Sequence, residues 1–442
     1  MDEFTVGLLV TGGLLVAVFL GVRVYVAASI AGLLGLVALR LAGGESFEDA
    51  WRIGGGIVGT IPHGKSVNYV LSVLPMFILI GFIAYHAGLT HDLFNAAKAW
   101  VGWVPGGLAV ASVFATAGFA AVSGASTATA AVFSRVAIPH MLDNGYDRKL
   151  AAGVVAAGGT LASLIPPSAI LVIYAIIVEE SVGTLILAGF LPGIVSALIY
   201  ALLIIGQCMI TPKLGPAIPA PPLGERIATL PGTIPIFAVV AIIFSAMAAG
   251  WATPTEAGAL GAFVVLLIAL FRGMKWHSLQ DALMETAKLT VMIFALIWGV
   301  LIFVRFLGFA GLPEAFANWI ISLPYPPTAI MVMILLGYAV LGMFMDAIGM
   351  LLLTLPVVYP AVIALGYDPI WFGIIVVKMC EVCLITPPVG LNCYVVAAVR
   401  PDIPLGDVFR GIFPFFLADA ATVGLFLAFP EIVLWLPNYV NS

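Results

Sequence analysis

The 442-residue sequence is poor in charge: Asp, Glu, Lys and Arg make up 9% of it, and 63% is hydrophobic. A soluble domain carries close to a quarter charged residues, so this composition excludes a soluble globular protein. A spanning helix needs about 20 apolar residues, which leaves room for roughly ten or eleven spans plus re-entrant segments. We therefore expect an all-α polytopic membrane protein embedded in a lipid bilayer.

The sequence also lacks the motifs of membrane-embedded enzymes and metal centres. It has no H-E-x-x-H and no G-x-G-D, which argues against an intramembrane hydrolase, and its five histidines form no ligand pair at helical spacing. Cys380 and Cys383 spell C-x-x-C, but no histidine or second pair accompanies them. We expect no enzyme activity, no organic cofactor and no nucleic-acid partner.

A basic leader region is also missing at the N-terminus. Met-Asp-Glu directly precedes an apolar run from Thr5, without a small-residue cleavage site before it. We expect the first helix to be a retained span.

An internal repeat organises the chain. GYDRKLAAGVVAAGGTLASLIPPSA begins at Gly145, and GYDPIWFGIIVVKMCEVCLITPPVG begins at Gly366, with Pro-Pro at the same distance in both. The offset, 366 − 145 = 221, is half of 442. A looser match, Ser-x-x-Asp-Ala from Ser46 and from Ser278, has an offset of 232. The two copies must therefore differ in insertions upstream of the main repeat.

The basic residues indicate that the two copies have opposite orientations. The loop after Gly145 carries Arg148 and Lys149, whereas residues 366–370 carry no Lys or Arg. Because basic loops stay on the cytoplasmic side, equivalent loops then face opposite sides of the membrane. Inverted-topology repeats place a binding site near the midplane, at interrupted helices.

Two proline pairs predict such interruptions, at IPP (165–167) and TPP (386–388). Proline removes a backbone donor and pushes the preceding residue out of helical geometry, so each pair is expected to split a span. The freed carbonyls suit a small hard cation. The half-helix N-termini that follow, near Ser168 and near Gly390 to Asn392, suit a carboxylate. Asn392 either donates to that anion or forms an interhelical hydrogen bond.

A small-residue segment, GFAAVSGASTATAA (118–131), precedes the first break and predicts a helical hairpin with its tip at 123–127. The offset of 221 places a second tip at 344–348, which includes Asp346. Acids inside apolar runs are costly and usually functional, so Asp346 is expected to serve an ion or substrate. Lys378 and Glu381, three apart on one helix, are expected to pair.

These segments resemble the large membrane subunit of TRAP (tripartite ATP-independent periplasmic) transporters over nearly the whole chain. The most specific stretches are SGASTATA, GYDRKLAAGVVAAGGTLASLIPPS, ATPTEAGALGA, GMFMDAIGMLLLTLPVVYP and LITPPVGLN. The resemblance implies an elevator-type importer of organic acids in the bacterial inner membrane, with Na⁺ as the coupling ion. It also implies a periplasmic substrate-binding protein and a small four-helix membrane subunit as partners.

The resemblance further implies two sodium sites, each formed by a hairpin tip and a broken helix, with several ligands contributed by backbone carbonyls. The first set is Ser123, Ser126, Ala162, Ile165 and Pro167; the second is Asp346, Cys383, Thr386 and Pro388. The family commonly has glycine where this chain has Ala162 and Cys383, which a carbonyl ligand tolerates. For the substrate we assign Thr127, Ser168, Gly390 and Asn392.

The expected organisation follows the repeat, with scaffold helices, interfacial arm helices and hairpin-containing transport segments. The segments are 1–88 (scaffold), 89–104 (arm), 105–180 (transport), 181–311 (scaffold and cytoplasmic connector), 312–324 (arm), 325–400 (transport) and 401–442 (a C-terminal span). A stand-alone sodium-coupled carboxylate symporter with the same inverted-repeat fold is the alternative. The expected substrate is a small carboxylate such as a C4-dicarboxylate or a sugar acid.

Overall fold

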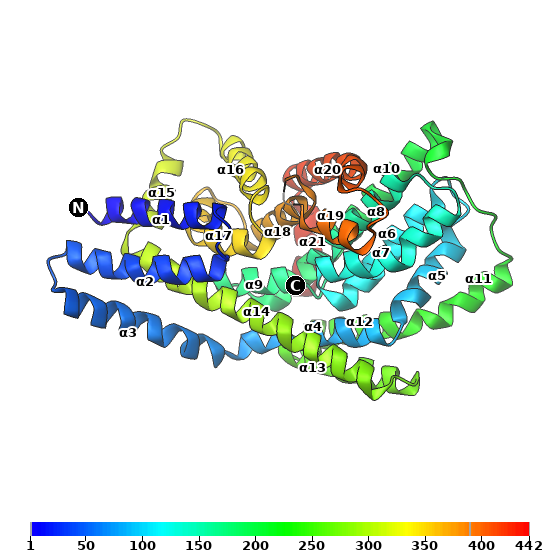
Figure 1. The fold of residues 1–442 in the computed structure, drawn as a ribbon, viewed down its shortest axis with the longest axis horizontal. Coiled ribbons are helices and arrows are strands. Elements are labelled where there is room, and N and C mark those ends of the chain that lie inside the picture. The colour runs from blue at the N-terminus through cyan, green and yellow to red at the C-terminus, as the bar shows by residue number, and fades with distance from the viewer. Residues whose placement is uncertain (1, 389, 442) are drawn as a thin grey trace.

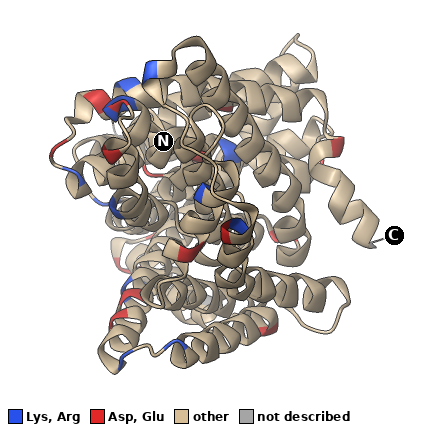
Figure 2. Ribbon diagram, turned by 90° about the vertical axis from the view of Figure 1, so that its right-hand side faces the viewer, with Lys and Arg blue, Asp and Glu red and all other residues tan. Residues whose placement is uncertain are grey.

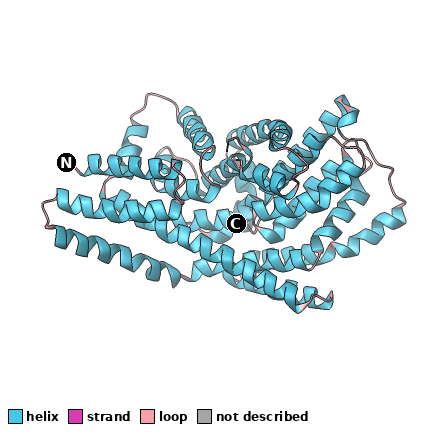
Figure 3. Ribbon diagram, viewed as in Figure 1, coloured by secondary structure: helices cyan, strands magenta, loops and turns pink. Residues whose placement is uncertain are grey.

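The computed structural model describes residues 2–388 and 390–441, and these residues form helices and no strands (Figure 3). The outermost positions of the first and last expected segments, Met1 and Ser442, lie outside this range. In Figure 1 the helices α3, α14 and α13 run along the lower edge, and the helices of the second half that carry the proline break, α18 and α19, lie above them. The all-α fold class is confirmed.

The first half of the chain consists of long helices interrupted by two short 3-10 turns. Its elements are α1 (Glu3–Phe19), α2 (Val24–Ala42), α3 (Phe47–Ser66), η1 (Tyr69–Ser72), α4 (Val73–His86), α5 (Leu89–Val101), α6 (Gly107–Ser123), α7 (Ser126–Asp143), α8 (Arg148–Thr160), η2 (Leu161–Ser163), α9 (Ala169–Val178) and α10 (Val182–Ile210).

A connector and the second half follow. The connector holds η3 (Pro212–Leu214), α11 (Leu223–Thr229) and η4 (Leu230–Gly232). The second half holds α12 (Ile234–Ala248), α13 (Pro254–Phe271), α14 (Trp276–Phe309), α15 (Leu312–Ile321), α16 (Pro327–Gly342), α17 (Ala347–Ala364), α18 (Pro369–Ile385), α19 (Leu391–Val399), α20 (Leu405–Ala428) and α21 (Glu431–Asn441).

The sequence repeat is also a structural repeat. Helices α7 and α17 begin and end 221 residues apart (347 − 126 and 364 − 143), and α8 and α18 begin 221 residues apart (369 − 148). The series α5 to α10 therefore matches α15 to α20, element by element. Each half contains a helix pair joined by a tight turn, α6 with α7 and α16 with α17, followed by a broken helix.

The change of offset upstream has a structural cause. The first half has α3, η1 and α4 where the second half has one continuous helix, α14. Between the two matched segments the first copy is 232 − 221 = 11 residues longer than the second. These residues are accommodated by dividing the stretch into separate helices. Asn68 starts η1 by accepting a hydrogen bond from the Val70 N–H at 2.9 Å, which separates α3 from α4.

The two halves are joined by close packing of α2 on α14 and of α4 on α13. A Cβ atom placed on Gly35 would lie 2.5 Å from the Phe306 ring, and one on Gly32 would lie 2.8 Å from the backbone of Ile302. Glycine at these positions lets the helix backbones approach each other closely, as small residues do in membrane helix pairs. The halves thus form one packed body.

Seven helices in the described residues are long and apolar enough to cross a membrane, or up to eight if the bent pair of α11–η4 with α12 is one span. Charged residues are sparse along the ribbon (Figure 2). The chain is a multi-pass membrane protein. How deeply the two hairpins enter the membrane stays a prediction.

The C-terminal segment differs from the expected single span. After α20 the chain turns at Phe429 and Pro430, and α21 packs against α10. Proline disfavours helical geometry at the residue before it, and Phe429 accordingly has the non-helical angles φ −130° and ψ 75°. Residues 401–441 therefore contain one long helix and one short helix that packs on α10.

Candidate functional site

Both Pro-Pro pairs interrupt helices at the expected places. The first break lies between η2 and α9, and the second lies between α18 and α19. Ser168 starts α9, because its Oγ accepts a hydrogen bond from the Leu171 N–H at 3.3 Å. Gly390 starts α19 with the left-handed φ of +36°, which glycine adopts without steric cost. Each break thus ends at a new helix N-terminus.

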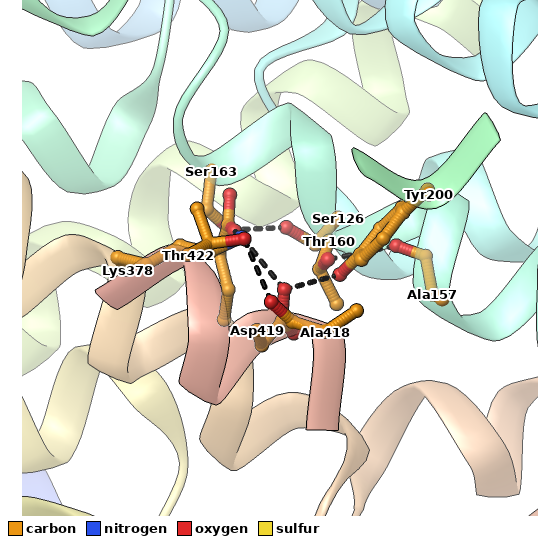
Figure 4. Close-up of polar contacts among 10 residues, drawn as sticks. Ser126, Ala157, Thr160, Ser163, Tyr200, Lys378, Ala418, Asp419 and Thr422 are labelled. Carbon is orange, nitrogen blue, oxygen red and sulfur yellow. Dashed lines mark hydrogen bonds and ion pairs between the residues drawn. The ribbon is translucent and has the colours of Figure 1, made fainter. Parts of the chain in front are cut away.

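The tip of the first hairpin is seated on the first break. Gly124 has φ +59°, and a Cβ atom on it would clash with the carbonyl oxygen of Pro167. At the start of α7, the Ser126 hydroxyl lies 2.5 Å from the Ser163 hydroxyl of η2 (Figure 4). Only a residue without a side chain allows this approach of tip and break.

The residues predicted for the first sodium site fall into these two touching segments. Ser123 ends α6 and its hydroxyl lies 2.9 Å from that of Thr129, while Ala162 and Ile165 are buried in and beside η2. The atoms that could bind a cation here are the hydroxyl and carbonyl oxygens of the predicted set, all of them neutral: Ser123, Ser126, Ala162, Ile165 and Pro167. Oxygen donors of this kind fit a hard cation such as Na⁺.

The second hairpin sits differently on its break. Gly342, at the end of α16, packs directly against Cys383 of α18, yet Pro387 and Pro388 are exposed. Their counterparts Pro166 and Pro167 are buried. The tip residue Phe344 instead meets Phe19 of α1, with ring centroids 5.3 Å apart. The second break is therefore less covered than the first.

The residues predicted for the second site have local partners. Asp346 starts α17 by accepting a hydrogen bond from the Gly349 N–H at 2.9 Å, and the Thr386 hydroxyl donates to the Val382 carbonyl at 2.5 Å. Cys383 is buried beside the hairpin, and Pro388 lies in the exposed part of the break. Asp346 carries the one charged group of this set.

Replacing Gly342 with alanine tests the packing of the second hairpin on α18. The added methyl group would overlap the Cys383 side chain, so we expect transport to fall at least tenfold, and Cys383→Gly in the same protein to restore it. Gly337→Ala is the matched control, because a Cβ at this α16 position meets no atom within 4 Å. Uptake rates of equal amounts of purified protein measure the effect; a Gly342→Ala protein as active as Gly337→Ala would contradict it.

Two of the four residues assigned to the substrate already form hydrogen bonds within the fold. Ser168 donates its hydroxyl to the Ser163 carbonyl, and Asn392 Nδ2 donates to the Ala156 carbonyl at 3.1 Å. Of the two alternatives for Asn392, the structure contains the interhelical hydrogen bond; its Oδ1 atom is buried without a partner. Thr127 is partly buried on α7, one residue after Ser126.

A cavity of about 210 Å³ lies between α4, the first hairpin and α14. Its lining includes Ser123 at the hairpin tip, Arg135 on α7 and Glu285 on α14. Glu285 is already paired with His86 at 3.1 Å. Arg135 was missed in the sequence, although an arginine in the apolar hairpin run is the same kind of signal as Asp346.

A second cavity, of about 500 Å³, lies beside the second hairpin. It is bounded by α1, α15, α16 and α17, and its lining is mainly aliphatic and aromatic. It offers few polar groups to a charged ligand. The cavity beside the first hairpin, which contains Arg135, is therefore the better candidate for an anionic substrate.

A buried charged cluster connects the broken helices with α10 and α20. Lys378 Nζ lies 2.6 Å from Glu381 Oε2 and 2.8 Å from Asp419 Oδ1. Tyr200 donates its hydroxyl to Asp419 at 2.7 Å (Figure 4). All four side chains are buried. The pairing of Lys378 with Glu381 is as predicted, whereas Asp419 and Tyr200 were missed, because nothing in the sequence indicates which helices face α18.

Two matching halves, each with a hairpin next to a broken helix and oxygen ligand atoms on both, define a membrane transporter component. The chain is a transport protein and not an enzyme. A family model described as "Tripartite ATP-independent periplasmic transporter, DctM component" matches residues 7–432, and the chain belongs to this family.

Named relatives agree with this assignment. The chain is 35% identical over 378 residues to the C4-dicarboxylate TRAP transporter large permease protein DctM of Pseudomonas aeruginosa, which covers 85% of this chain and 88% of that protein. It is 31% identical over 342 residues to the isethionate TRAP transporter permease protein DctMQ of Oleidesulfovibrio alaskensis, with 75% of this chain but only 52% of that protein covered.

Among solved structures, the YdaH transporter of Alcanivorax borkumensis has a similar fold. The TM-score is 0.55 at 15% sequence identity, and the match covers 87% of this chain and 90% of the other. At this identity the likeness concerns the fold alone.

Proposed function

We propose that this large permease imports a small organic acid across the bacterial inner membrane, driven by sodium and by an elevator movement of the hairpin-bearing segments. The observation that carries the proposal is the first hairpin tip. It is seated on a broken helix through Gly124 and Ser126, and it opens onto a cavity with Arg135. A cation site and an anion-binding side chain thus share one structural element.

Sodium ions would couple the gradient to the movement of the substrate. The oxygen atoms of Ser123, Ser126, Ala162, Ile165 and Pro167 would hold one ion, and those of Asp346, Cys383, Thr386 and Pro388 a second. Two sodium ions that move with a monoanion carry one net positive charge inward, and a membrane potential supplies about 2.3 kcal/mol per such charge per 100 mV, in addition to the sodium concentration gradient. With a dianion the movement is electroneutral, and the concentration gradient alone drives it. An ion between tip and break would keep the hairpin closed while the loaded segments move.

Arg135 is our candidate for binding the substrate's anionic group. A guanidinium group binds a carboxylate or sulfonate through paired hydrogen bonds. The two named relatives are transporters of a C4-dicarboxylate and of isethionate, both of them small organic anions, which differ in shape and in number of charges. This supports a small organic anion as the substrate class.

A periplasmic substrate-binding protein and a small four-helix membrane subunit are the proposed partners. The family's description as tripartite and periplasmic supports two further components. The DctMQ relative is about twice as long as its matching part, which supports a large permease that functions together with a second membrane component.

Uptake into proteoliposomes tests the proposal. The purified permease with its membrane partner, an inward sodium gradient and a panel of organic anions should give uptake that requires both sodium and the binding protein. Sodium-driven uptake without any binding protein would instead support the stand-alone carboxylate symporter. Uptake indifferent to sodium would refute the coupling.

The role of Arg135 is tested in the same assay. A hydrogen bond to a charged group contributes about 1.5–3 kcal/mol, so Arg135→Gln should raise KM for the anion roughly 10- to 100-fold. Arg410→Gln is the matched control: Arg410 is largely exposed and lies 3.8 Å from Asp407 at the start of α20. Equal KM values in the two variants would exclude Arg135 from the substrate site.

A further inference from the structure

The buried cluster of Lys378, Glu381 and Asp419 has more negative than positive charge. One ammonium group faces two carboxyl groups on side chains that have no exposed surface, and with both carboxyl groups ionised the cluster carries one net negative charge. Glu381 Oε1 and Asp419 Oδ2 are buried and accept no hydrogen bond. The lysine contacts the other oxygen of each carboxyl group, Glu381 Oε2 and Asp419 Oδ1.

The cluster touches the elements of both breaks. Lys378 and Glu381 lie on α18, and Glu381 is two residues before Cys383, in the last turns before the second break. On the other side, Tyr200 binds Asp419, and its hydroxyl lies beside that of Thr160, the last residue of α8 (Figure 4). Thr160 directly precedes η2, whose Ser163 contacts the tip of the first hairpin.

We propose that this cluster supplies the negative charge that holds sodium ions at the two breaks, with Asp419 as a positioning residue outside both ligand sets. The inference rests on the proposed sodium coupling and deepens it. The cluster acts through space on ions bound by neutral oxygens, and through the Asp419–Tyr200 hydrogen bond on the segment that leads into the first break.

The first predicted site needs such a charge. Its ligands are hydroxyl and carbonyl oxygens, and a cation surrounded only by neutral groups in a low-dielectric interior is costly. A unit charge about 10 Å from the ion, at an effective dielectric constant of about 20, changes the binding constant roughly tenfold or more. The first set contains no acidic residue, because Asp346 at the tip of the second hairpin belongs to the second set.

Packing alone does not require the second carboxylate. One lysine and one carboxylate already make a neutral buried pair, and a surplus buried charge costs stability unless it has a partner. A fold that retains both Glu381 and Asp419 around a single Lys378 tolerates that cost. A cation bound near the cluster would compensate the surplus charge.

The experiment measures sodium affinity, from the rise in melting temperature of the purified permease with increasing sodium chloride against choline chloride. Asp419→Asn and Glu381→Gln each leave a neutral pair with Lys378, so both proteins should fold. Both should bind sodium roughly tenfold more weakly than the wild type. Asp407→Asn is the matched control on the same helix, because Asp407 pairs with Arg148 at 2.6 Å and not with the cluster. The sodium affinity of this variant should stay within about twofold of the wild-type value.

The conservative change separates charge from shape. Asp419→Glu keeps the charge and alters the fit, so it should lower the melting temperature without sodium but retain near-wild-type sodium affinity. If Asp419→Asn and Glu381→Gln bind sodium as tightly as the wild type, or if Asp419→Glu is as weak as Asp419→Asn, the inference is wrong. A wild-type protein without any sodium-dependent stabilisation would instead overturn the proposed function.

Discussion

Replacing Gly124 with alanine is expected to abolish sodium-dependent uptake, with a loss of at least a hundredfold. The methyl group would strike the carbonyl oxygen of Pro167, so the hairpin tip must lift away from the break. Lifting the tip separates Ser126 from Ser163 and opens the predicted cation site. The positive φ of Gly124 adds about 1–2 kcal/mol of backbone strain.

Gly145→Ala is the control for the backbone strain alone. Gly145 also has a positive φ, +77°, but a Cβ atom there meets nothing within 4 Å. We expect this variant to keep most of its uptake at a slightly lower melting temperature. Uptake by proteoliposomes under an inward sodium gradient, normalised to the amount of inserted protein, separates the two. Similar activities of Gly124→Ala and Gly145→Ala would show that the contact with Pro167 does not matter.

Replacing Lys378 with methionine is expected to produce the largest loss of stability. The change leaves Glu381 and Asp419 as two buried carboxylates without a cation, and breaking a buried ion pair in this way costs about 3–5 kcal/mol. Asp419→Asn should be far better tolerated, because Lys378 and Glu381 remain paired. Thermal unfolding of the purified proteins, followed by tryptophan fluorescence, gives the order of stability.

Lys288→Met provides the comparison for the loss of a lysine as such. Lys288 lies on α14 with an exposed side chain, so its replacement should change stability by no more than about 0.5 kcal/mol. If Lys378→Met unfolds at the same temperature as Lys288→Met, the two carboxylates of the cluster are not held by the lysine, and the charge assignment above fails as well.

The sequence repeat predicts much of this fold because prolines, glycines and turns lie at a constant offset. The offset of 221 residues places the second hairpin and the second break, and it reproduces both ends of α17 from those of α7. The position of the 11 additional residues was not predictable. A stretch of this length reads equally well as two helices, such as α3 and α4, or as one long helix, such as α14.

The site was harder to predict from the sequence, because its geometry depends on which faces of distant helices meet. Asp419 is 41 positions after Lys378, and no periodicity relates the two. Equal spacing also predicts equal hairpins, yet Pro167 is buried and Pro388 is exposed. The two tips also differ in side-chain size: Gly124 admits the Pro167 carbonyl to the first tip, whereas its counterpart at the offset of 221 is Met345. The neighbouring Phe344 ring packs on α1.

The pairing of α2 with α14 also bears on how the protein is made. Gly32 contacts Ile302, a residue that is synthesised 302 − 32 = 270 positions later. In the same way, α4 is synthesised before α13, the helix on which it packs. Throughout most of translation the small-residue face of α2 has no native neighbour, and lipid or an insertion factor must cover it. Neither copy of the duplicated unit can complete its own packing, so separating them into two polypeptides would require their faces to find each other within the bilayer.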